Sequence, residues 1–128
     1  MEMMLKELTK AEEEVMQYLW RLEIASVKEI IAVMDEPKPA TNTVSTIIRI
    51  LEQKGFVNHQ AKGRGYQYFP LISKEQYQEF SVNKVVKSYF GGSLSKLVSF
   101  FAEKEKIDTK ELDDILKIIE QNRDKKWY

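Results

Sequence analysis

The sequence predicts a mostly helical protein with one β-hairpin, and three observations support this fold class. Apolar residues recur at helical spacing in six segments of the 128-residue chain. Most of these segments begin with a side chain suited to cap a helix N-terminus. Between the third and fourth segments, the strand-like runs Phe56-Val57 and Tyr66-Gln67-Tyr68-Phe69 flank the basic tetrapeptide Lys62-Gly63-Arg64-Gly65, which predicts a tight turn.

The first two helices are predicted from their capping boxes, in which Ser or Thr is followed three residues later by Glu. These boxes begin at Thr9 and Ser26. They open helices that we expect to end near Leu22 and Met34. Prolines at positions 37 and 39 then interrupt the helical pattern.

The third helix is expected to run from about Thr41 or Asn42, as its N-terminal caps, to Lys54. Its apolar residues fall at i, i+3, i+4 and i+7 and therefore share one face: Val44, Ile47, Ile48 and Leu51. The other side carries short hydrogen-bonding side chains and one cation: Thr43, Ser45, Thr46 and Arg49. Such side chains can approach base edges closely, and Arg suits bidentate contact to guanine.

Three helices followed by a hairpin with a basic tip is the order of a winged helix-turn-helix DNA-binding domain. We assign residues 1–72 to this domain. Thr43, Ser45, Thr46 and Arg49 are predicted to contact bases in the major groove, and Asn42, Lys54, Lys62 and Arg64 to contact phosphates or the minor groove. Taken alone, the third helix is equally compatible with an ordinary amphipathic surface helix, so the DNA interpretation depends on its neighbours.

Residues 73–128 are predicted to form a helical dimerisation region. Ser73 begins a third capping box, Gly91-Gly92 breaks the helix that follows, and Asp108 opens the last helix. Three helices in about 55 residues would be marginally stable alone, and a second copy is the simplest cover for their apolar faces. The residues expected in that interface are Leu94, Leu97, Val98, Phe101, Leu112, Ile115, Leu116 and Ile119.

Charge is distributed unevenly, although the net charge of the chain is zero. Residues 1–36 carry four basic and nine acidic side chains, a net charge of −5. Residues 37–72 carry five basic side chains against Glu52 alone, a net charge of +4. The basic charge thus lies where the DNA-facing parts are predicted. It is modest for one subunit, which again favours a dimer.

Several classes of function are excluded by composition. The absence of cysteine excludes disulfides, thiol catalysis and thiolate metal sites, and His59 cannot form a zinc site alone. No phosphate loop, serine–histidine pair or metal-ligand spacing is present, so we expect neither an enzyme nor a cofactor. With no signal peptide and no apolar run of about 18 residues, we expect a cytoplasmic protein without membrane insertion.

Three stretches resemble one known family. They are Leu8-Thr9-Lys10-Ala11-Glu12 running to Trp20, Asn42-Thr43-Val44-Ser45-Thr46 running to Val57, and Leu97-Val98 running to Glu105. Over nearly its whole length the chain resembles the penicillinase and methicillin-resistance repressors of the BlaI/MecI type. This resemblance implies a dimeric repressor that binds a palindromic operator and controls genes for antibiotic resistance. It also implies a partner, because several members are inactivated when a membrane sensor-protease responds to β-lactam and triggers cleavage in the dimerisation helix.

The chain departs from that family's pattern at three places. Ile50 stands where the family usually has Arg, and Phe100-Phe101 stands at the expected proteolytic site, where well-studied members have Asn-Phe. Members that respond to copper use C-terminal cysteine pairs, which this chain lacks. The operator, the regulated genes and the inducing signal cannot be read from the sequence.

We therefore predict a transcriptional repressor. Two other classes of function fit the same residues. One is a winged-helix module whose third helix binds a protein instead of DNA. The other is a regulator that senses a small molecule in a pocket at the domain junction.

Overall fold

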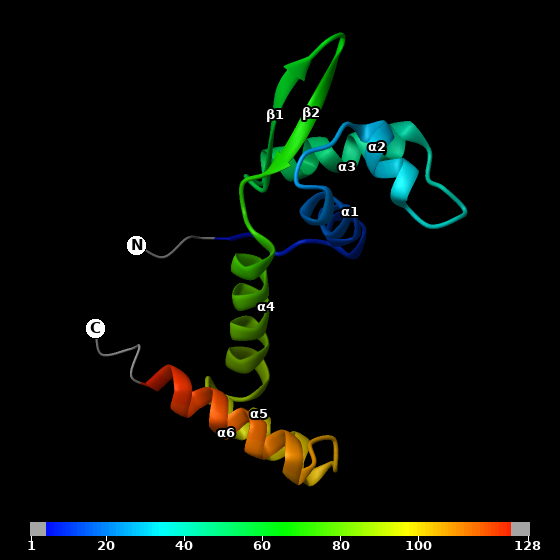
Figure 1. Ribbon diagram of the computed structural model, residues 1–128. Helices are drawn as coiled ribbons and strands as arrows, with labels where there is room; N and C mark the ends of the chain where they lie inside the picture. Colours follow the sequence, from blue (N-terminus) through cyan, green and yellow to red (C-terminus); the bar gives the residue numbers. More distant parts are fainter. Residues whose placement is uncertain (1–4, 124–128) are drawn as a thin grey trace. The chain divides into compact units, whose positions relative to one another are not determined.

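The computed structural model describes residues 5–123 and confirms the predicted fold class. Three helices precede a hairpin and three follow it (Figure 1). Their bounds are α1 Lys10–Leu22, α2 Val27–Val33, α3 Thr41–Gln53, β1 Val57–Lys62, β2 Gly65–Pro70, α4 Lys74–Tyr89, α5 Leu94–Glu103 and α6 Thr109–Arg123. The chain divides into two compact units, residues 1–81 and 82–128. Within the described part, no helix has the length and apolar character needed to cross a membrane.

The predicted starts of α1, α2, α4 and α6 are confirmed by hydrogen bonds. The Thr9 hydroxyl accepts from the Glu12 amide, and the Glu12 carboxylate accepts from the Thr9 amide. The same reciprocal pair joins Ser26 to Glu29. Ser73 pairs with Gln76 in this way, and the Asp108 carboxylate accepts from the Glu111 amide. Each box satisfies amides that the helix itself leaves without an acceptor.

The core of the first unit lies between α1, α2, α3 and the base of the hairpin. The apolar stripe predicted for α3 faces it, with Val44, Ile48 and Leu51 fully buried and Ile47 half-buried. Its fully buried neighbours are Val15, Met16, Leu19, Ile30, Phe56 and Val57. Because this stripe is fixed in the core, the opposite side of α3 must face outward.

The connection between α2 and α3 is closed by Lys38. Its ammonium donates to the carbonyls of Ile31, Ala32 and Met34 at distances of 3.1, 3.0 and 2.7 Å. These carbonyls lie at the C-terminal end of α2, where helical acceptors lack intrahelical donors. Lys38 thereby fixes the turn that sets α3 against α2.

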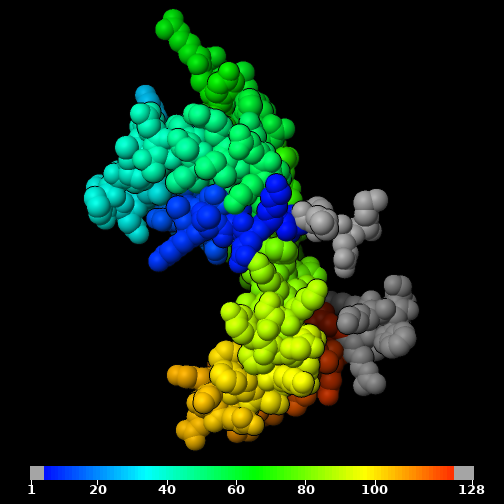
Figure 2. All heavy atoms as spheres, turned by 180° about the vertical axis from the view of Figure 1, so that it is seen from behind, coloured from blue at the N-terminus to red at the C-terminus, as the bar shows by residue number. Residues whose placement is uncertain are grey.

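The hairpin is antiparallel, with Val57 opposite Pro70 at its base and Lys62 opposite Gly65 at its tip. Gly63 has a φ of 62°, which the first central residue of a tight hairpin turn requires and glycine adopts without strain. Near the base, Tyr68 exchanges two backbone hydrogen bonds with Ala25, at 2.9 and 2.8 Å. Beyond that point the hairpin projects from the rest of its unit (Figure 2).

The start of α4 belongs to the first unit through two long-range hydrogen bonds. The Trp20 indole donates to the Ile72 carbonyl at 2.8 Å, and the Leu8 amide donates to the Tyr77 hydroxyl at 3.0 Å. Tyr77 also packs edge-on against Phe56, with ring centroids 5.6 Å apart. The winged-helix core therefore extends past Leu71 into the first turns of α4.

The second unit contains the last part of α4 together with α5 and α6, and it buries little. Within it, Phe90 packs edge-on against Phe100, and no residue of α5 is fully buried. Of the predicted interface residues, Leu97, Val98, Leu112 and Ile115 are half-buried. The other four are exposed: Leu94, Phe101, Leu116 and Ile119.

Candidate nucleic-acid interface

The outward side of α3 carries the predicted base-reading side chains. Thr43, Thr46 and Arg49 are exposed and Ser45 is half-buried. The Thr46 hydroxyl donates back to the Asn42 carbonyl at 2.8 Å, so its proton is engaged within the helix while its oxygen can still accept. The side therefore presents hydroxyl groups around one guanidinium, a set that can contact base edges.

The N-terminus of α3 differs from the prediction that Thr41 or Asn42 caps it. Ala40 is the N-cap, with the extended φ and ψ of −67° and 148°, and it provides no side-chain acceptor. Thr41 and Asn42 are already inside the first turn, and both are exposed. The prediction was wrong because position 40, not 41, adopts the extended backbone of a cap. The first-turn amides are consequently left without a side-chain cap.

Lys54 lies apart from the other predicted DNA contacts. Its ammonium is 2.5 Å from the Glu12 carboxylate and 3.3 Å from the Glu7 carbonyl oxygen, and its side chain is only 22% exposed. Burial pushes the pKa of Glu12 up, but hydrogen bonds from Lys54 and from the Thr9 amide outweigh it and hold that pKa below its ordinary value. Lys54 thus joins the end of α3 to the start of α1.

The wing tip carries the two remaining predicted contacts. Lys62 is the last residue of β1 and Arg64 lies in the turn, and both are exposed. Hydrogen bonds from the Ser26 amide and hydroxyl hold the pKa of Glu29 below its ordinary value, and the charge of Lys62 adds a smaller effect in the same direction. The tip therefore presents cations on a projecting, two-stranded support.

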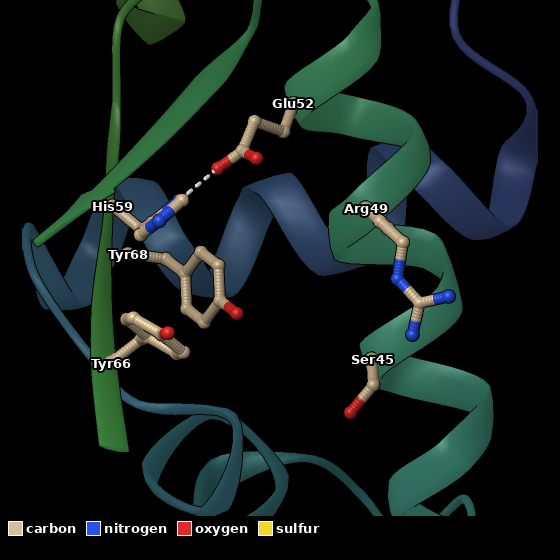
Figure 3. Close-up of a pocket in the computed structure, with 6 residues that line it drawn as sticks. All are labelled: Ser45, Arg49, Glu52, His59, Tyr66 and Tyr68. Atoms are coloured by element: carbon tan, nitrogen blue, oxygen red, sulfur yellow. Dashed lines mark hydrogen bonds and ion pairs between the residues drawn. The ribbon is translucent and has the colours of Figure 1, made fainter. Parts of the chain in front are cut away.

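A pocket of about 330 Å³ lies between α3 and the wing (Figure 3). Its α3 side is formed by Ser45 and Arg49, which were predicted, and by Glu52, which sequence reasoning missed. Glu52 follows Arg49 by three residues and Ser45 by seven, so helical spacing alone could have placed it on this face. The wing side is formed by His59, Tyr66 and Tyr68.

The wing side of this pocket is aromatic and is joined to α3 by a side-chain hydrogen bond. His59 Nδ1 contacts the Glu52 carboxylate, and the His59 ring lies 4.9 Å from that of Tyr66 and 5.8 Å from that of Tyr68. Burial raises the pKa of the Tyr68 phenol, and the Glu52 charge adds to this while Arg49 opposes it. His59 is exposed on β1.

A hydroxyl-rich helix face, an adjacent basic wing and a shared pocket between them define a winged helix-turn-helix DNA-binding protein. The family described as penicillinase repressor matches residues 8–121, and the chain belongs to this family. The BlaI/MecI family consists of DNA-binding transcriptional repressors and not of enzymes.

Individual relatives agree with this assignment. The penicillinase repressor of Bacillus licheniformis is 26% identical over 121 residues, covering 94% of this chain and 94% of its own. The methicillin resistance regulatory protein MecI of Staphylococcus aureus (strain N315) is 27% identical over 114 residues, covering 88% and 93%. The solution structure of the DNA binding domain of the repressor BlaI matches with a TM-score of 0.50 and 30% identity, over 58% of this chain and 94% of that one.

Proposed function

We propose that this repressor binds a palindromic operator as a homodimer, with α3 in the major groove and the wing against the flanking backbone. The observation that carries the proposal is the pocket that α3 and the wing both border. Because the two elements are neighbours, an α3 helix that lies in the major groove brings the wing to the DNA backbone beside that groove. In this arrangement the residues contacting base edges are Thr43, Ser45, Thr46 and Arg49.

Phosphate contacts are assigned to the two ends of this surface. Asn42 and the uncapped first-turn amides of α3 can bind a phosphate, because a helix N-terminus carries partial positive charge and free donors. Lys62 and Arg64 contact phosphates or the minor groove from the wing tip. Lys54 is left out, because its ammonium is engaged by Glu12.

We propose that residues 1–72 bind DNA and that residues 73–128 form the dimer interface. Support for dimerisation comes from the apolar side chains that the second unit leaves uncovered: Leu94 is 60% exposed, and Leu116 and Ile119 are each 57% exposed. Apolar faces of this kind are usually covered by a partner. In a two-fold symmetric dimer, each copy covers the apolar face of the other.

Induction is proposed by analogy with the relatives named above, whose names connect them with penicillinase and methicillin resistance. In this proposal a cytoplasmic dimer is inactivated when a membrane sensor-protease responds to β-lactam. Phe100 and Phe101 lie within α5 and are 43% and 39% exposed. A protease would have to open that helix locally to cut between them.

The test is a gel shift with DNA from the region upstream of the chain's own coding sequence, repeated at several salt concentrations. We expect affinity to fall steeply with salt, because binding releases counterions from the neutralised phosphates. The Arg49→Ala variant should show a smaller preference for this DNA over a scrambled duplex. Absence of salt-dependent binding would instead favour a protein partner for α3.

A further inference from the structure

The Glu52–His59 contact is the only side-chain hydrogen bond that joins α3 to the wing among the described residues. Glu52 lies in the last turn of α3, and His59 lies in the middle of β1. The dashed contact in Figure 3 therefore connects the helix that enters the groove with the hairpin beside it.

The position of this pair along the hairpin is informative. His59 is directly opposite Tyr68 in the strand register, and Tyr68 is the residue bonded through its backbone to Ala25. Both edges of the hairpin are thus held at one level, β2 by the backbone of Ala25 and β1 by the side chain of Glu52. A ribbon held along one edge only can turn about that edge, and the second attachment removes this freedom.

The ring of His59 also contacts the part of the hairpin between Tyr68 and the tip. It packs edge-on against Tyr66, which lies beyond Tyr68 toward the tip, and it also contacts Tyr68. Tyr66 is immediately after Gly65, the partner of Lys62. A fixed His59 ring therefore restrains the strand that carries the basic tip.

We infer that Glu52 and His59 are positioning residues that set the angle of the wing relative to α3, so that Lys62 and Arg64 reach the DNA while α3 occupies the groove. This inference rests on the proposed function. Neither residue needs to touch DNA for it to hold.

A competing explanation based on charge alone makes the opposite prediction. Glu52 is the single acidic residue between positions 37 and 72, and its side chain is 34% exposed. If it acted only through its charge, replacing it with Met, which has neither the charge nor an oxygen acceptor for His59, would reduce repulsion of phosphates and tighten binding to every sequence. If it positions the wing, the same change weakens binding, because the tip contacts are lost.

Stability should respond little in either case. The His59 and Glu52 side chains are 38% and 34% exposed, and polar contacts between exposed side chains contribute little to folding. A change in DNA contact without a change in unfolding midpoint would thus separate positioning from general destabilisation.

The experiment is a double-mutant cycle on the full-length chain, with an operator duplex selected from random DNA. Arg64→Ala is measured in the parent, in Glu52→Met and in His59→Phe, which keeps an aromatic ring against Tyr66 but cannot bond to Glu52. In the parent, Arg64→Ala should flatten the log–log salt dependence by about 0.9. In both other backgrounds we expect it to have no further effect.

Footprinting of the same complexes identifies which contacts are lost. Both single variants should lose hydroxyl-radical protection at the wing position and retain guanine protection in the major groove. Glu14→Met, which removes an exposed acid from α1, is the matched control and should keep both protections. Full additivity of Arg64→Ala with Glu52→Met, or tighter binding by Glu52→Met with both protections kept, would overturn the inference. A parent chain that binds no DNA would overturn the proposed function itself.

Discussion

Arg49 and Lys54 are two cations near the end of α3 whose surroundings differ. Arg49 is exposed and lines the pocket shared with the wing. Lys54 is paired with the buried Glu12. The Glu12 carboxylate also accepts a hydrogen bond from the Thr9 amide in the capping box of α1. In sequence both are simply basic residues of one helix. The partner of Lys54 is 42 residues away, so no local spacing could have shown that its charge is already engaged.

The first prediction at this scale concerns base reading by Arg49. Arg49→Ala should weaken binding to the preferred operator by about 1–3 kcal/mol and relax the preference at one base pair, because a bidentate contact to guanine is lost. Titration against a set of single-base operator variants measures both effects. Arg21→Ala, which removes a cation from α1, should leave the preference unchanged. Equal affinity of Arg49→Ala and the parent chain would remove Arg49 from the interface.

The second prediction concerns stability and the Lys54–Glu12 pair. Lys54→Met leaves the Glu12 carboxylate without its ammonium partner in a site where Glu12 is 5% exposed, so unfolding free energy should fall by about 1–3 kcal/mol at neutral pH. Urea denaturation measures this loss. Because Lys54 is assigned no DNA contact, operator affinity of the folded variant should be nearly unchanged. A variant that folds normally but loses DNA affinity would restore the phosphate role.

The same pair gives a pH dependence. The folded-state pKa of Glu12 lies below its ordinary value of 4.5, so the unfolded chain binds this proton more readily than the folded chain. The stabilisation is present above the unfolded pKa and is lost as pH falls through the folded pKa. Denaturation curves between pH 3 and pH 7 should show stability of the parent falling below about pH 4.5, and a weaker acid dependence in Lys54→Met. Identical pH profiles would contradict this account.

At the scale of elements, the helices were predictable because their signals are local. Thr9, Ser26 and Ser73 each bond to a residue three positions away, so the caps can be read directly from the sequence. The start of α3 was placed less well, because Ala40 caps it by backbone conformation without a side-chain signal. The attachment of the wing to α3 was missed for a similar reason, since the Glu52–His59 contact depends on how a strand returns past a helix.

The prediction for the wing follows from its form. Lys62 and Arg64 lie at the end of a projecting hairpin. The glycines beside them form the turn and have no side chain that could contact a base. Lys62→Ala and Arg64→Ala should therefore lower affinity for operator and scrambled DNA by the same factor. Each lost phosphate contact should flatten the log–log salt dependence by about 0.9. Unchanged slopes in both variants would mean that the wing does not touch the DNA.

At the scale of the whole molecule, the two units differ in how much of their apolar surface they bury. The first buries a continuous core and adds the start of α4 through Trp20 and Tyr77. The second leaves large apolar side chains uncovered, among them Leu94, Leu116 and Ile119. The helical spacing of these residues was readable from sequence, but their exposure was not, because spacing cannot say whether a face is covered within one chain or by another. A second copy supplies the missing cover in our proposal.

The prediction at this scale is that Leu116→Asp makes the chain monomeric. A carboxylate in an apolar interface is costly to bury, whereas on a free surface at this 57% exposed position it is tolerated. The variant should keep a folded winged-helix unit and bind a half-site only weakly, because the second set of contacts is no longer tethered. Glu111→Asp, an exposed acid-for-acid change in α6, is the control that should remain dimeric. A dimeric Leu116→Asp chain would place the interface elsewhere.

The central claim is that two copies of this chain bind one operator together through α3 and the wing. Sedimentation equilibrium of the full-length protein, alone and with a selected operator duplex, tests it most directly. We predict a dimer at micromolar concentration and a complex with the mass of two chains per duplex. A protein that remains monomeric under these conditions and still binds its operator tightly as a single chain would contradict the account.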